Sequence, residues 1–286
     1  MAKRRRIQGK AVRPKRPPSA ASKAPPKNKP PRKQRKQQQP QQQPTIPFEP
    51  ADRILLIGEG DLSFAASAIK HHGCVNVTAT VLEKDHAELV QKYPGVDANI
   101  AVVLGDDGKG DEDGTNNKLL YNVDAAKLPP SLSRPPLHDH IIFNFPHVGG
   151  KSTDVNRQVR HNQSLLVAFF ASALPALAPR GSIVVTLFDG EPYTLWNVRD
   201  LARHAGLAVE RSFAFHAAAY PGYRHARTGG VVTNRRGEAG GGWRGEHRPA
   251  RSYVFRRKGE VEAQPAAKKR RRRGQDDDSS DEDEDD

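Results

Sequence analysis

The chain has 286 residues and a formal net charge of +13, but this charge is unevenly distributed. Residues 1–48 contain fifteen Lys and Arg and no acidic residue, whereas residues 268–286 hold six consecutive cations followed by nine carboxylates. The stretch 49–267 has a charge of only +1. The basic character therefore belongs to the two ends, and this excludes a strongly basic globular core as its source.

The two ends are too polar to bury a hydrophobic core. We expect 1–48 to be a disordered basic arm rich in Pro and Gln, and 258–286 to be a disordered tail that is first basic and then acidic. The arm suits contact with nucleic acid through counterion release, although nuclear import or solubility explains it equally well. In the tail, Ser279 and Ser280 lie among carboxylates, a setting that invites an acidophilic kinase.

Several features argue against membrane and metal functions. No apolar stretch reaches the length of a membrane span or forms a signal-peptide core, so we expect a soluble, intracellular protein. The single cysteine, Cys74, follows two histidines but has no second ligand cluster, which favours a solvated helix end over a metal site. The Gly- and Asp-rich insertion 105–117 lacks the ligand pattern of a calcium loop and is interpreted as a flexible surface loop.

Between residues 49 and 257, apolar runs of strand length alternate with helical patterns. This alternation predicts one α/β domain, in which a doubly wound, mostly parallel sheet has helices on both faces. The predicted strands are 53–57, 75–83, 119–123, 141–145, 182–188, 207–215 and 252–256. The predicted helices are 62–70, 86–93, 154–173 (capped by Thr153 or Asp154) and 193–204.

Ligands of such sheets bind beyond the carboxyl ends of the strands. Strand 53–57 runs into Gly58-Glu59-Gly60-Asp61-Leu62-Ser63, where two glycines let the backbone approach a ligand and the next helix offers free N–H groups. A dinucleotide site would have a third glycine in place of Ser63, and the carboxylates of Glu59 and Asp61 would repel a pyrophosphate. They would attract the cationic sulfonium and amino group of S-adenosylmethionine. Alone, the glycine pair also fits a tight turn.

Acidic side chains also follow the next two predicted strands. Glu83 ends strand 75–83, where a carboxylate can accept hydrogen bonds from both ribose hydroxyls. Asp124 follows strand 119–123, where it can accept the exocyclic amine of adenine. Each acid alone is more often a helix cap. The ordered set of a glycine loop and two acids at successive strand ends favours an adenosyl ligand.

Strand 141–145 leads into Asn144-Phe145-Pro146-His147. Polar groups, a rigid turn and an imidazole are thereby placed where a transferable methyl group would lie, although a Pro-Gly loop with an exposed histidine is the alternative. In the following helix, Arg157, Arg160 and other polar residues occupy the first turns and apolar residues dominate the rest. We expect the second half of this helix to pack on the sheet and the first half to face a ligand.

Taken together, these segments resemble the fungal large-subunit rRNA (uridine-N3) methyltransferase family, whose members have a Rossmann-like, class I methyltransferase domain. The resemblance covers most of residues 52–256. Its most specific part is Ile-Ile-Phe-Asn-Phe-Pro-His-Val-Gly-Gly at 141–150 with Arg-Gln-Val-Arg-His-Asn-Gln-Ser-Leu-Leu at 157–166. Further matches are Ile-Gly-Glu-Gly-Asp-Leu-Ser-Phe (57–64), Val-Asp-Ala (123–125), Val-Thr-Leu-Phe-Asp-Gly-Glu-Pro-Tyr (185–193) and Tyr-Pro-Gly-Tyr-Arg-His (220–225).

The resemblance implies that the last two strands form an antiparallel hairpin whose connection, residues 216–250, is unusually long. The chain departs from the family at Glu83, where Asp is usual, and at Ala126, where Thr is usual. The implied function is S-adenosylmethionine-dependent methylation of N3 of one rRNA uridine during ribosome assembly, in the nucleus and nucleolus. The expected partner is large-subunit rRNA or a pre-ribosomal particle, bound by a monomeric core and without a membrane.

Uracil N3 must lose its proton before it attacks well, and in a helix that edge is paired, so the base must be unpaired or flipped. We predict that Asn144 and the Phe145 carbonyl bind the uracil edge, that Pro146 shapes the loop, and that His147 accepts the proton or stacks on the base. RNA phosphates or neighbouring bases are expected to contact Arg157, Arg160, Tyr223, Arg224 and His225.

Two other functions fit parts of the same sequence. A non-catalytic ribosome-assembly factor could keep the fold, and even the cofactor, while binding pre-rRNA through its arm. A methyltransferase could instead act on another base or on a protein amide nitrogen. The intact segments 58–61 and 144–147 favour catalysis over the first of these. Without the resemblance, the residues do not distinguish uridine from other nitrogen acceptors.

Overall fold

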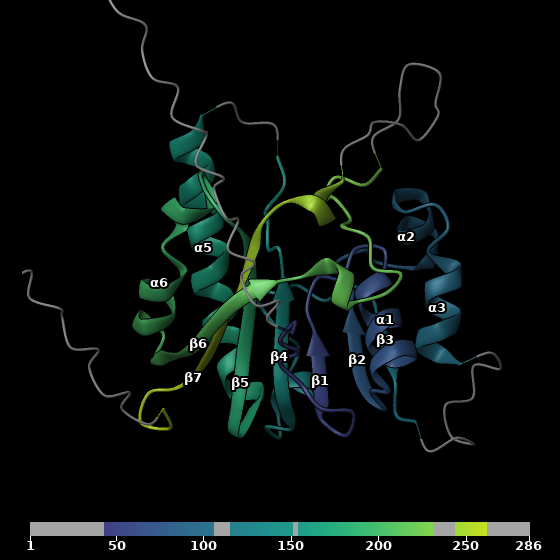
Figure 1. Ribbon diagram of the computed structural model, residues 1–286, viewed down its shortest axis with the longest axis horizontal. Coiled ribbons are helices and arrows are strands. Elements are labelled where there is room, and N and C mark those ends of the chain that lie inside the picture. Colours follow the sequence, from purple (N-terminus) through teal and green to yellow (C-terminus); the bar gives the residue numbers. More distant parts are fainter. Residues whose placement is uncertain (1–42, 106–114, 151–153, 232–243, 262–286) are drawn as a thin grey trace, which may run out of the picture. The chain divides into compact units, whose positions relative to one another are not determined.

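The computed structural model describes residues 43–105, 115–150, 154–231 and 244–261 (Figure 1). They form a seven-stranded sheet in the order β3-β2-β1-β4-β5-β7-β6. Strand β7 is antiparallel to both β5 and β6, and the other neighbouring pairs are parallel. The strands are β1 (Arg53–Leu56), β2 (Asn76–Thr80), β3 (Lys118–Leu120), β4 (His138–Asn144), β5 (Leu177–Phe188), β6 (Leu207–Phe215) and β7 (Ala250–Arg257). The predicted fold class is confirmed.

Helices lie against the sheet in two groups, one on each side of the molecule (Figure 1). The first group is α1 (Ser63–His72), α2 (His86–Lys92) and α3 (Asp97–Leu104), and the second includes α5 (Val155–Ala173) and α6 (Val198–His204). The remaining turns of helix are α4 (Pro130–Ser133) and the 3-10 segments η1 (Leu174–Ala176), η2 (Tyr193–Trp196), η3 (Ala217–Ala219) and η4 (Gly245–His247).

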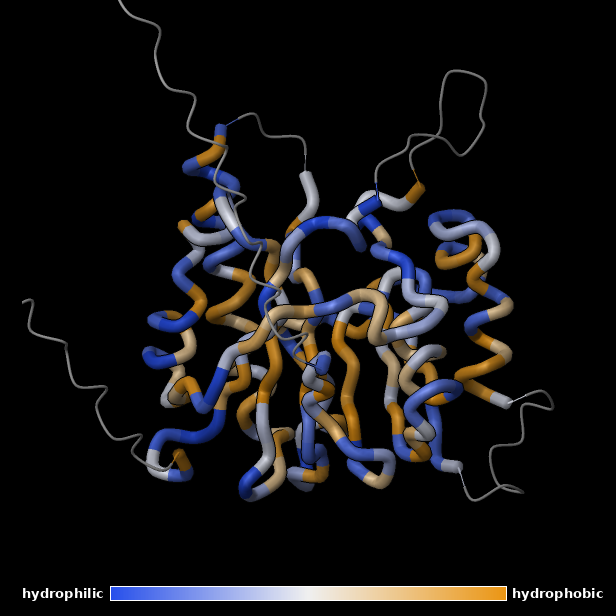
Figure 2. The backbone as a smooth tube through the Cα atoms, in the orientation of Figure 1, coloured by the Kyte–Doolittle hydropathy of each residue, from blue (hydrophilic) through white to orange (hydrophobic). Residues whose placement is uncertain are grey.

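Each face of the sheet has its own hydrophobic core, because the central strands are apolar at consecutive positions and successive side chains point to opposite faces. In β1, Leu55 packs in a core with α5 and α6, whereas Ile54 and Leu56 pack in a core with α1 and α3. Figure 2 shows the hydrophobic segments concentrated in these central strands. Burial on both faces holds the strand ends in a fixed arrangement, and the loops at those ends are therefore held in place.

Two predicted elements differ from the observed ones, and one observed helix was not predicted. Strand 75–83 ends at Thr80, and the chain then turns with Glu83 buried beside α2. Helix 193–204 is interrupted at Asn197, whose left-handed φ of 52° separates η2 from α6. Helix α3 was not predicted, because its residues are apolar almost throughout and give little amphipathic periodicity.

The predicted arm boundary at residue 48 is placed too late. Phe48 is buried, and its ring packs edge-on against Phe64 of α1, so the folded unit includes at least part of the segment 43–48. The described residues do not include 1–42 and 262–286, so most of the predicted disorder and the prediction for Ser279 and Ser280 lie outside them. Most of the 105–117 insertion also lies outside the described residues.

The interpretation of Cys74 as part of a solvated helix end is wrong. Gly73 ends α1 in the left-handed region, and the chain then turns inwards so that Cys74 is buried. Burial raises the pKa of its thiol to about 12. Within the described ranges, no helix is both long enough and apolar enough to cross a membrane.

Candidate functional site

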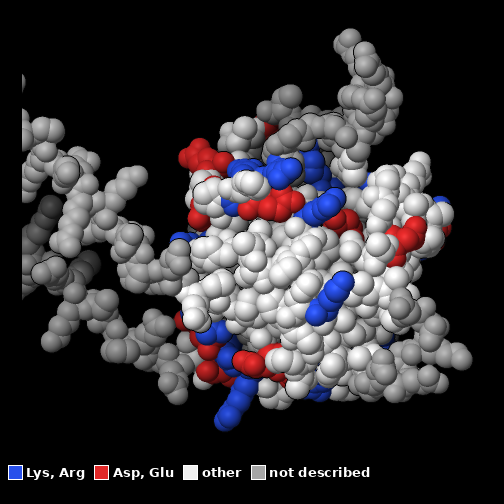
Figure 3. Space-filling view, turned by 45° about the vertical axis from the view of Figure 1, so that its right-hand side comes forward, with Lys and Arg blue, Asp and Glu red and all other residues white. Residues whose placement is uncertain are grey.

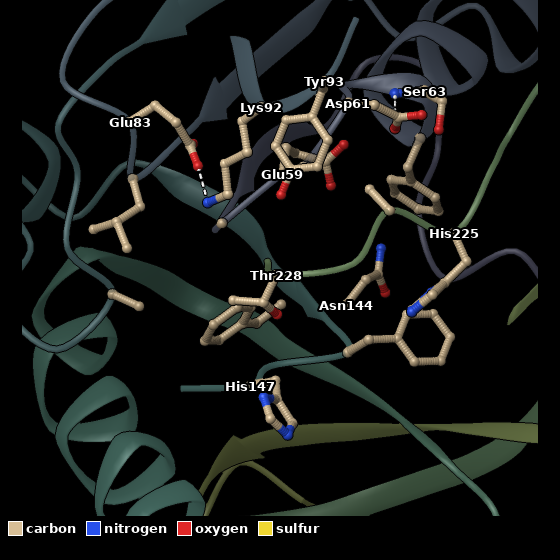
Figure 4. Close-up of a pocket in the computed structure, with 18 of the residues that line it drawn as sticks. Glu59, Asp61, Ser63, Glu83, Lys92, Tyr93, Asn144, His147, His225 and Thr228 are labelled. Carbon is tan, nitrogen blue, oxygen red and sulfur yellow. Dashed lines mark hydrogen bonds and ion pairs between the residues drawn. The ribbon is translucent and has the colours of Figure 1, made fainter. Parts of the chain in front are cut away.

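The loops that follow β1, β2, β3 and β4 meet at the carboxyl edge of the sheet and enclose a cavity of about 190 Å³ (Figure 4). The strand order reverses between β1 and β4, the position where open α/β sheets bind ligands. Every residue predicted to bind the cofactor lines this cavity, namely Gly58, Glu59, Gly60, Asp61, Ser63, Glu83, Asp124 and Asn144. The cavity is therefore the site that the sequence predicts.

The glycine loop needs its glycines for space as well as for conformation. Gly58 has a φ of +63°, and a Cβ built on it would lie 3.0 Å from the ring of Phe143. A Cβ on Gly60 would lie 2.5 Å from the Cβ of Ala226, which belongs to a distant part of the chain. Both positions bring backbone close to other segments, so larger residues would fill the space through which a ligand reaches the loop.

The two carboxylates of the loop lie in a poorly solvated setting. Burial raises the pKa of Glu59 to about 8, although its carboxylate accepts a hydrogen bond from the Ala65 N–H at 3.2 Å. Burial also raises the pKa of Asp61, against the opposing effect of hydrogen bonds from Ser63. Because the charged forms are penalised, a cationic ligand beside them would recover electrostatic energy. This arrangement fits a sulfonium or an ammonium group.

Glu83 and Asp124 differ in their surroundings. Glu83 is buried and forms an ion pair with Lys92, which also lines the cavity (Figure 4). Asp124 is exposed and accepts a hydrogen bond from the Ala126 N–H at 2.8 Å. Lys92 was not predicted, because the last turn of α2 gives no sequence pattern that points back to the sheet edge. Both acids stay predicted cofactor ligands.

Asn144 presents a buried amide to the cavity. Its Oδ1 accepts a hydrogen bond from the Thr186 hydroxyl at 2.7 Å, and Thr186 is in turn bonded to Ser252 at 2.9 Å. Its Nδ2 is buried without a described partner, and in Figure 4 it points towards the acidic side of the cavity. A buried donor without a partner is costly, so this amide is set to bond a ligand.

The turn after Asn144 is held in an unusual conformation. Phe145 has a left-handed φ of 52°, and its N–H donates to the Thr186 carbonyl at 2.8 Å. Pro146 follows, buried. A non-glycine residue in this region is strained and persists only where its surroundings fix it. The predicted role of Pro146 in shaping the loop is consistent with this geometry.

His147 lies in the cavity wall, but its hydrogen bonding does not suit a base. Its Nδ1 accepts a hydrogen bond from the Gly149 N–H at 2.8 Å, which selects the tautomer with the proton on Nε2. Burial lowers the pKa of the ring. The Nε2 is therefore a donor, and the hypothesis that His147 accepts the uracil proton conflicts with this arrangement.

A segment between β6 and β7, residues 224–231, lies over the cavity, and we call it the strap. The Ser63 hydroxyl accepts a hydrogen bond from the Arg224 N–H at 2.9 Å and donates one to the Arg224 carbonyl at 3.0 Å. The Tyr93 hydroxyl donates to the Arg227 carbonyl at 3.0 Å. The glycine loop and α2 are thus tied to the strap, and only the length of the 216–250 connection indicated such a role.

The five predicted RNA contacts do not form one surface. Arg157, Arg160 and Arg224 are exposed, as the prediction requires. Tyr223 and His225 instead turn inwards, where the Tyr223 hydroxyl bonds His225 Nδ1 at 3.1 Å and both residues line the cavity. Burial raises the pKa of Tyr223 and lowers that of His225 to about 4. Their contact with RNA stays a prediction, and it would have to be made from within the cavity.

The described surface shows no concentration of one charge on the face in Figure 3, where cations and anions are interspersed along two edges. This agrees with the near-neutral charge of the stretch 49–267. Among the described residues, no group of three or more His, Cys, Asp and Glu side chains is arranged to hold a metal ion.

Comparison with known proteins identifies relatives. Residues 55–227 match the model of a family described as rRNA (uridine-N3-)-methyltransferase BTM5-like. The 25S rRNA (uridine(2634)-N(3))-methyltransferase of Saccharomyces cerevisiae is 28% identical over 265 residues, covering 73% of this chain and 74% of the yeast protein. Heavy metal-associated isoprenylated plant protein 41 of Arabidopsis thaliana is 33% identical over 185 residues, covering 62% of this chain but 33% of the plant protein.

Among solved structures, TrmN from Thermus thermophilus is 20% identical, with a TM-score of 0.41, covering 73% of this chain and 45% of that chain. The assignment to a family rests on the sequence match, which spans the glycine loop, the Asn144 turn and the first half of the strap. Because this match extends over more than half of the chain, the protein is a methyltransferase that belongs to the BMT5-like family of rRNA (uridine-N3)-methyltransferases.

Proposed function

We propose that this protein methylates N3 of a uridine in large-subunit rRNA during ribosome biogenesis, with S-adenosylmethionine as the methyl donor. The observation that supports this most directly is the Asn144 amide, a buried donor without a described partner at the edge of an acidic cavity. The name of the yeast relative supplies the acceptor atom and the class of RNA.

The cavity residues fit the proposed donor in chemistry and in space. Glu59 and Asp61 offer carboxylates in a poorly solvated loop, which suits the sulfonium and amino group. We assign Glu83 to the ribose hydroxyls and Asp124 to the adenine amine, because both residues line the cavity. When bound, the donor supplies an electrophilic methyl group, and the work of the protein is to align it with the acceptor and exclude water.

The acceptor base is expected at the Asn144 turn. The Asn144 Nδ2 can donate to a uracil carbonyl, and the strained Phe145 conformation fixes where the carbonyl of that residue points. A uracil in a helix is paired along the edge that contains N3, so the base must leave its stack to reach this turn. The strap and α5 would then contact the neighbouring nucleotides.

The wider setting follows from the same proposal. We propose that the protein acts on rRNA in the nucleus and nucleolus, and that the cations of residues 1–48 bind rRNA phosphates. We expect the folded core to act as a monomer on the pre-ribosomal particle. A fluorescent fusion that stays outside the nucleolus would contradict the location, and sedimentation as a stable dimer would contradict the monomeric core.

An acceptor screen tests the function. Purified full-length protein is incubated with methyl-labelled S-adenosylmethionine and, separately, unmodified large-subunit rRNA, small-subunit rRNA and ribosomal proteins. Label in large-subunit rRNA alone is the expected result. Label in protein would identify a different nitrogen acceptor. Binding of both donor and rRNA without transfer of label would instead identify a non-catalytic assembly factor.

A further inference from the structure

A second cavity, of about 400 Å³, adjoins the first one. Five residues line both cavities where the two adjoin, and we call them the shared wall, namely Phe145, His147, His225, Ala226 and Thr228. Beyond this wall, aromatic rings of Phe188 and Tyr193 line the second cavity, with their centroids 5.3 Å apart. Phe188 is buried, so the half-buried ring of Tyr193 is the aromatic surface on which an unstacked base could stack, and this makes the second cavity suitable for the acceptor.

The two cavities differ sharply in charge. The first cavity is lined by the two cations Lys92 and Arg224 and by four carboxylates, those of Glu59, Asp61, Glu83 and Asp124. The described lining of the second cavity has no carboxylate but includes the guanidinium groups of Arg227 and Arg248. The remaining titratable groups there are His147, Tyr193 and His225. A cationic donor is favoured on one side of the wall and an anionic acceptor on the other.

Arg248 is an exposed residue, and its guanidinium has a defined position in the lining of this second cavity. Its guanidinium carbon lies 4.2 Å from the centroid of the Phe188 ring and 5.5 Å from that of Tyr193. No described carboxylate lies within ion-pair distance of it. The two rings orient the guanidinium by cation–π contact without neutralising its charge, which leaves the charge available to a ligand.

Neither histidine of the shared wall is suited to remove the uracil proton. His147 has Nδ1 occupied by the Gly149 N–H, so its Nε2 is a donor. His225 is packed edge-on against Phe145 at 4.5 Å and against Phe188 at 4.9 Å. Burial in this setting lowers its pKa to about 4, which makes it a weak base at neutral pH. A reaction at N3 therefore needs another way to favour the deprotonated base.

We propose that the second cavity binds the flipped uracil and that Arg248 is a catalytic residue that stabilises the uracil anion formed when N3 loses its proton. This inference rests on the proposed function. The N3–H bond breaks and its proton passes to solvent water, leaving negative charge shared between N3 and the two carbonyl oxygens. The N3 electron pair forms the new bond to the methyl carbon, and the carbon–sulfur bond breaks with its electron pair remaining on sulfur.

The test combines a charge deletion with a more acidic substrate. Arg248→Gln is compared with wild type on two large-subunit rRNA transcripts, one with uridine and one with 5-fluorouridine, whose N3 proton is more acidic. At neutral pH, Arg248→Gln is expected to lower kcat on the uridine transcript by about 10²-fold, the usual effect of losing one electrostatic contact to a developing anion. The fluorinated transcript is expected to restore most of this loss.

Three comparisons separate this role from a structural one. Arg199→Gln removes a similar cation–π contact, 5.3 Å from the Tyr253 ring centroid and outside the second cavity, and should leave kcat unchanged on both transcripts. Arg248→Lys keeps a cation and should retain more activity than Arg248→Gln. The loss in Arg248→Gln should also shrink as pH rises, because hydroxide increasingly forms the anion without help.

Equal impairment of Arg248→Gln on both transcripts would overturn the inference, as would a rise in KM with kcat unchanged, which indicates RNA binding alone. Either result requires a wild-type protein that methylates both transcripts, so the proposed function would stand. A wild-type protein that methylates neither transcript would overturn the proposed function, and the inference with it. Donor binding by calorimetry confirms that each variant is folded.

Discussion

At the scale of single residues, the site depends on how buried polar groups are paired. A series of hydrogen bonds connects Ser252, Thr186 and Asn144. It provides a donor for the oxygen of the Asn144 amide and leaves the nitrogen of that amide for a ligand. An apolar residue at position 186 would free this amide to rotate. The orientation of one side chain is thus set by two hydroxyl groups on neighbouring strands β5 and β7.

Asn144→Asp is expected to lower kcat by about 10²- to 10³-fold, because it replaces the free Nδ2 donor with an acceptor of the same shape. The measurement is steady-state transfer of label to rRNA, with donor affinity determined by calorimetry as the control for folding. Transfer at the wild-type rate would show that the amide nitrogen makes no contact in the transition state.

The pH dependence of donor binding follows from Glu59. Burial raises its pKa to about 8, so the empty site holds this carboxyl protonated at neutral pH. A cationic donor favours the ionised form, so binding releases a proton and affinity increases with pH until about pH 8. Calorimetry in two buffers of different ionisation enthalpy measures the release. Glu59→Gln should weaken binding and flatten its pH dependence, whereas proton uptake by wild type would contradict the assignment.

The raised pKa of Glu59 makes the donor-free protein less stable as pH rises, although it makes donor binding stronger over the same range. The folded pKa of Glu59 is raised above its unfolded value, so its contribution to stability is fully present below about pH 4.5 and is lost as pH rises to about 8. Glu59→Gln should therefore raise the melting temperature at about pH 8.5 more than at about pH 5.5. Thermal unfolding without donor checks this, and a Tm difference independent of pH would contradict it.

The positions of the predicted strand ends were sufficient to bring the predicted cofactor ligands to one cavity, because the carboxyl ends of neighbouring parallel strands lie at the same edge of the sheet. They did not predict Lys92, which approaches Glu83 from the far end of a short helix. They also did not indicate that Tyr223 and His225 line the cavity, since a loop sequence does not reveal on which side of a strap each residue lies. Hydrogen bonding within the 147–149 turn, which sets the histidine tautomer, is likewise decided by backbone geometry.

At the scale of elements, the strap completes the cavity that the sheet edge begins. Gly60 and Ala226 come from segments far apart in the chain, and any side chain on Gly60 would overlap Ala226. The strand and helix pattern alone predicted a connection of unusual length but no contact between it and the glycine loop. Elements with clear periodicity, such as β1, β4 and α5, were predicted closely, whereas α3 and the break at Asn197 depend on tertiary packing.

A compensating pair of substitutions tests the contact between strap and loop. Gly60→Ala introduces a Cβ that would lie 2.5 Å from the Ala226 Cβ, and overpacking of this kind costs about 1–3 kcal/mol. We expect a lower Tm and weaker donor binding. Adding Ala226→Gly removes the overlapping carbon and should restore much of both. A double variant no better than Gly60→Ala would show that the strap does not lie on the loop.

At the scale of the whole molecule, charge and catalysis are assigned to different parts of the chain. The fifteen cations of residues 1–48 contrast with a stretch 49–267 of nearly zero net charge. The core provides the cavities, and the arm provides most of the attraction expected for rRNA phosphates. Composition alone was sufficient to predict this division, although the burial of Phe48 moves its boundary towards the N-terminus.

Deletion of residues 1–42 should weaken rRNA binding and make its dependence on salt concentration shallower, because counterion release scales with the number of phosphate contacts. Donor affinity and Tm of the core should stay unchanged. Filter binding of rRNA across a salt series provides the measurement. An identical salt slope with and without the arm would mean that the folded core makes the phosphate contacts instead.

The atom proposed to accept the methyl group is N3 of a uridine in large-subunit rRNA. Unmodified large-subunit rRNA is incubated with the protein and methyl-labelled S-adenosylmethionine, digested to nucleosides and analysed by mass spectrometry. We predict that the label appears in 3-methyluridine, and that Asn144→Asp reduces this product in proportion to its loss of kcat. Label in any other nucleoside, or none in rRNA that the protein binds, would contradict the account.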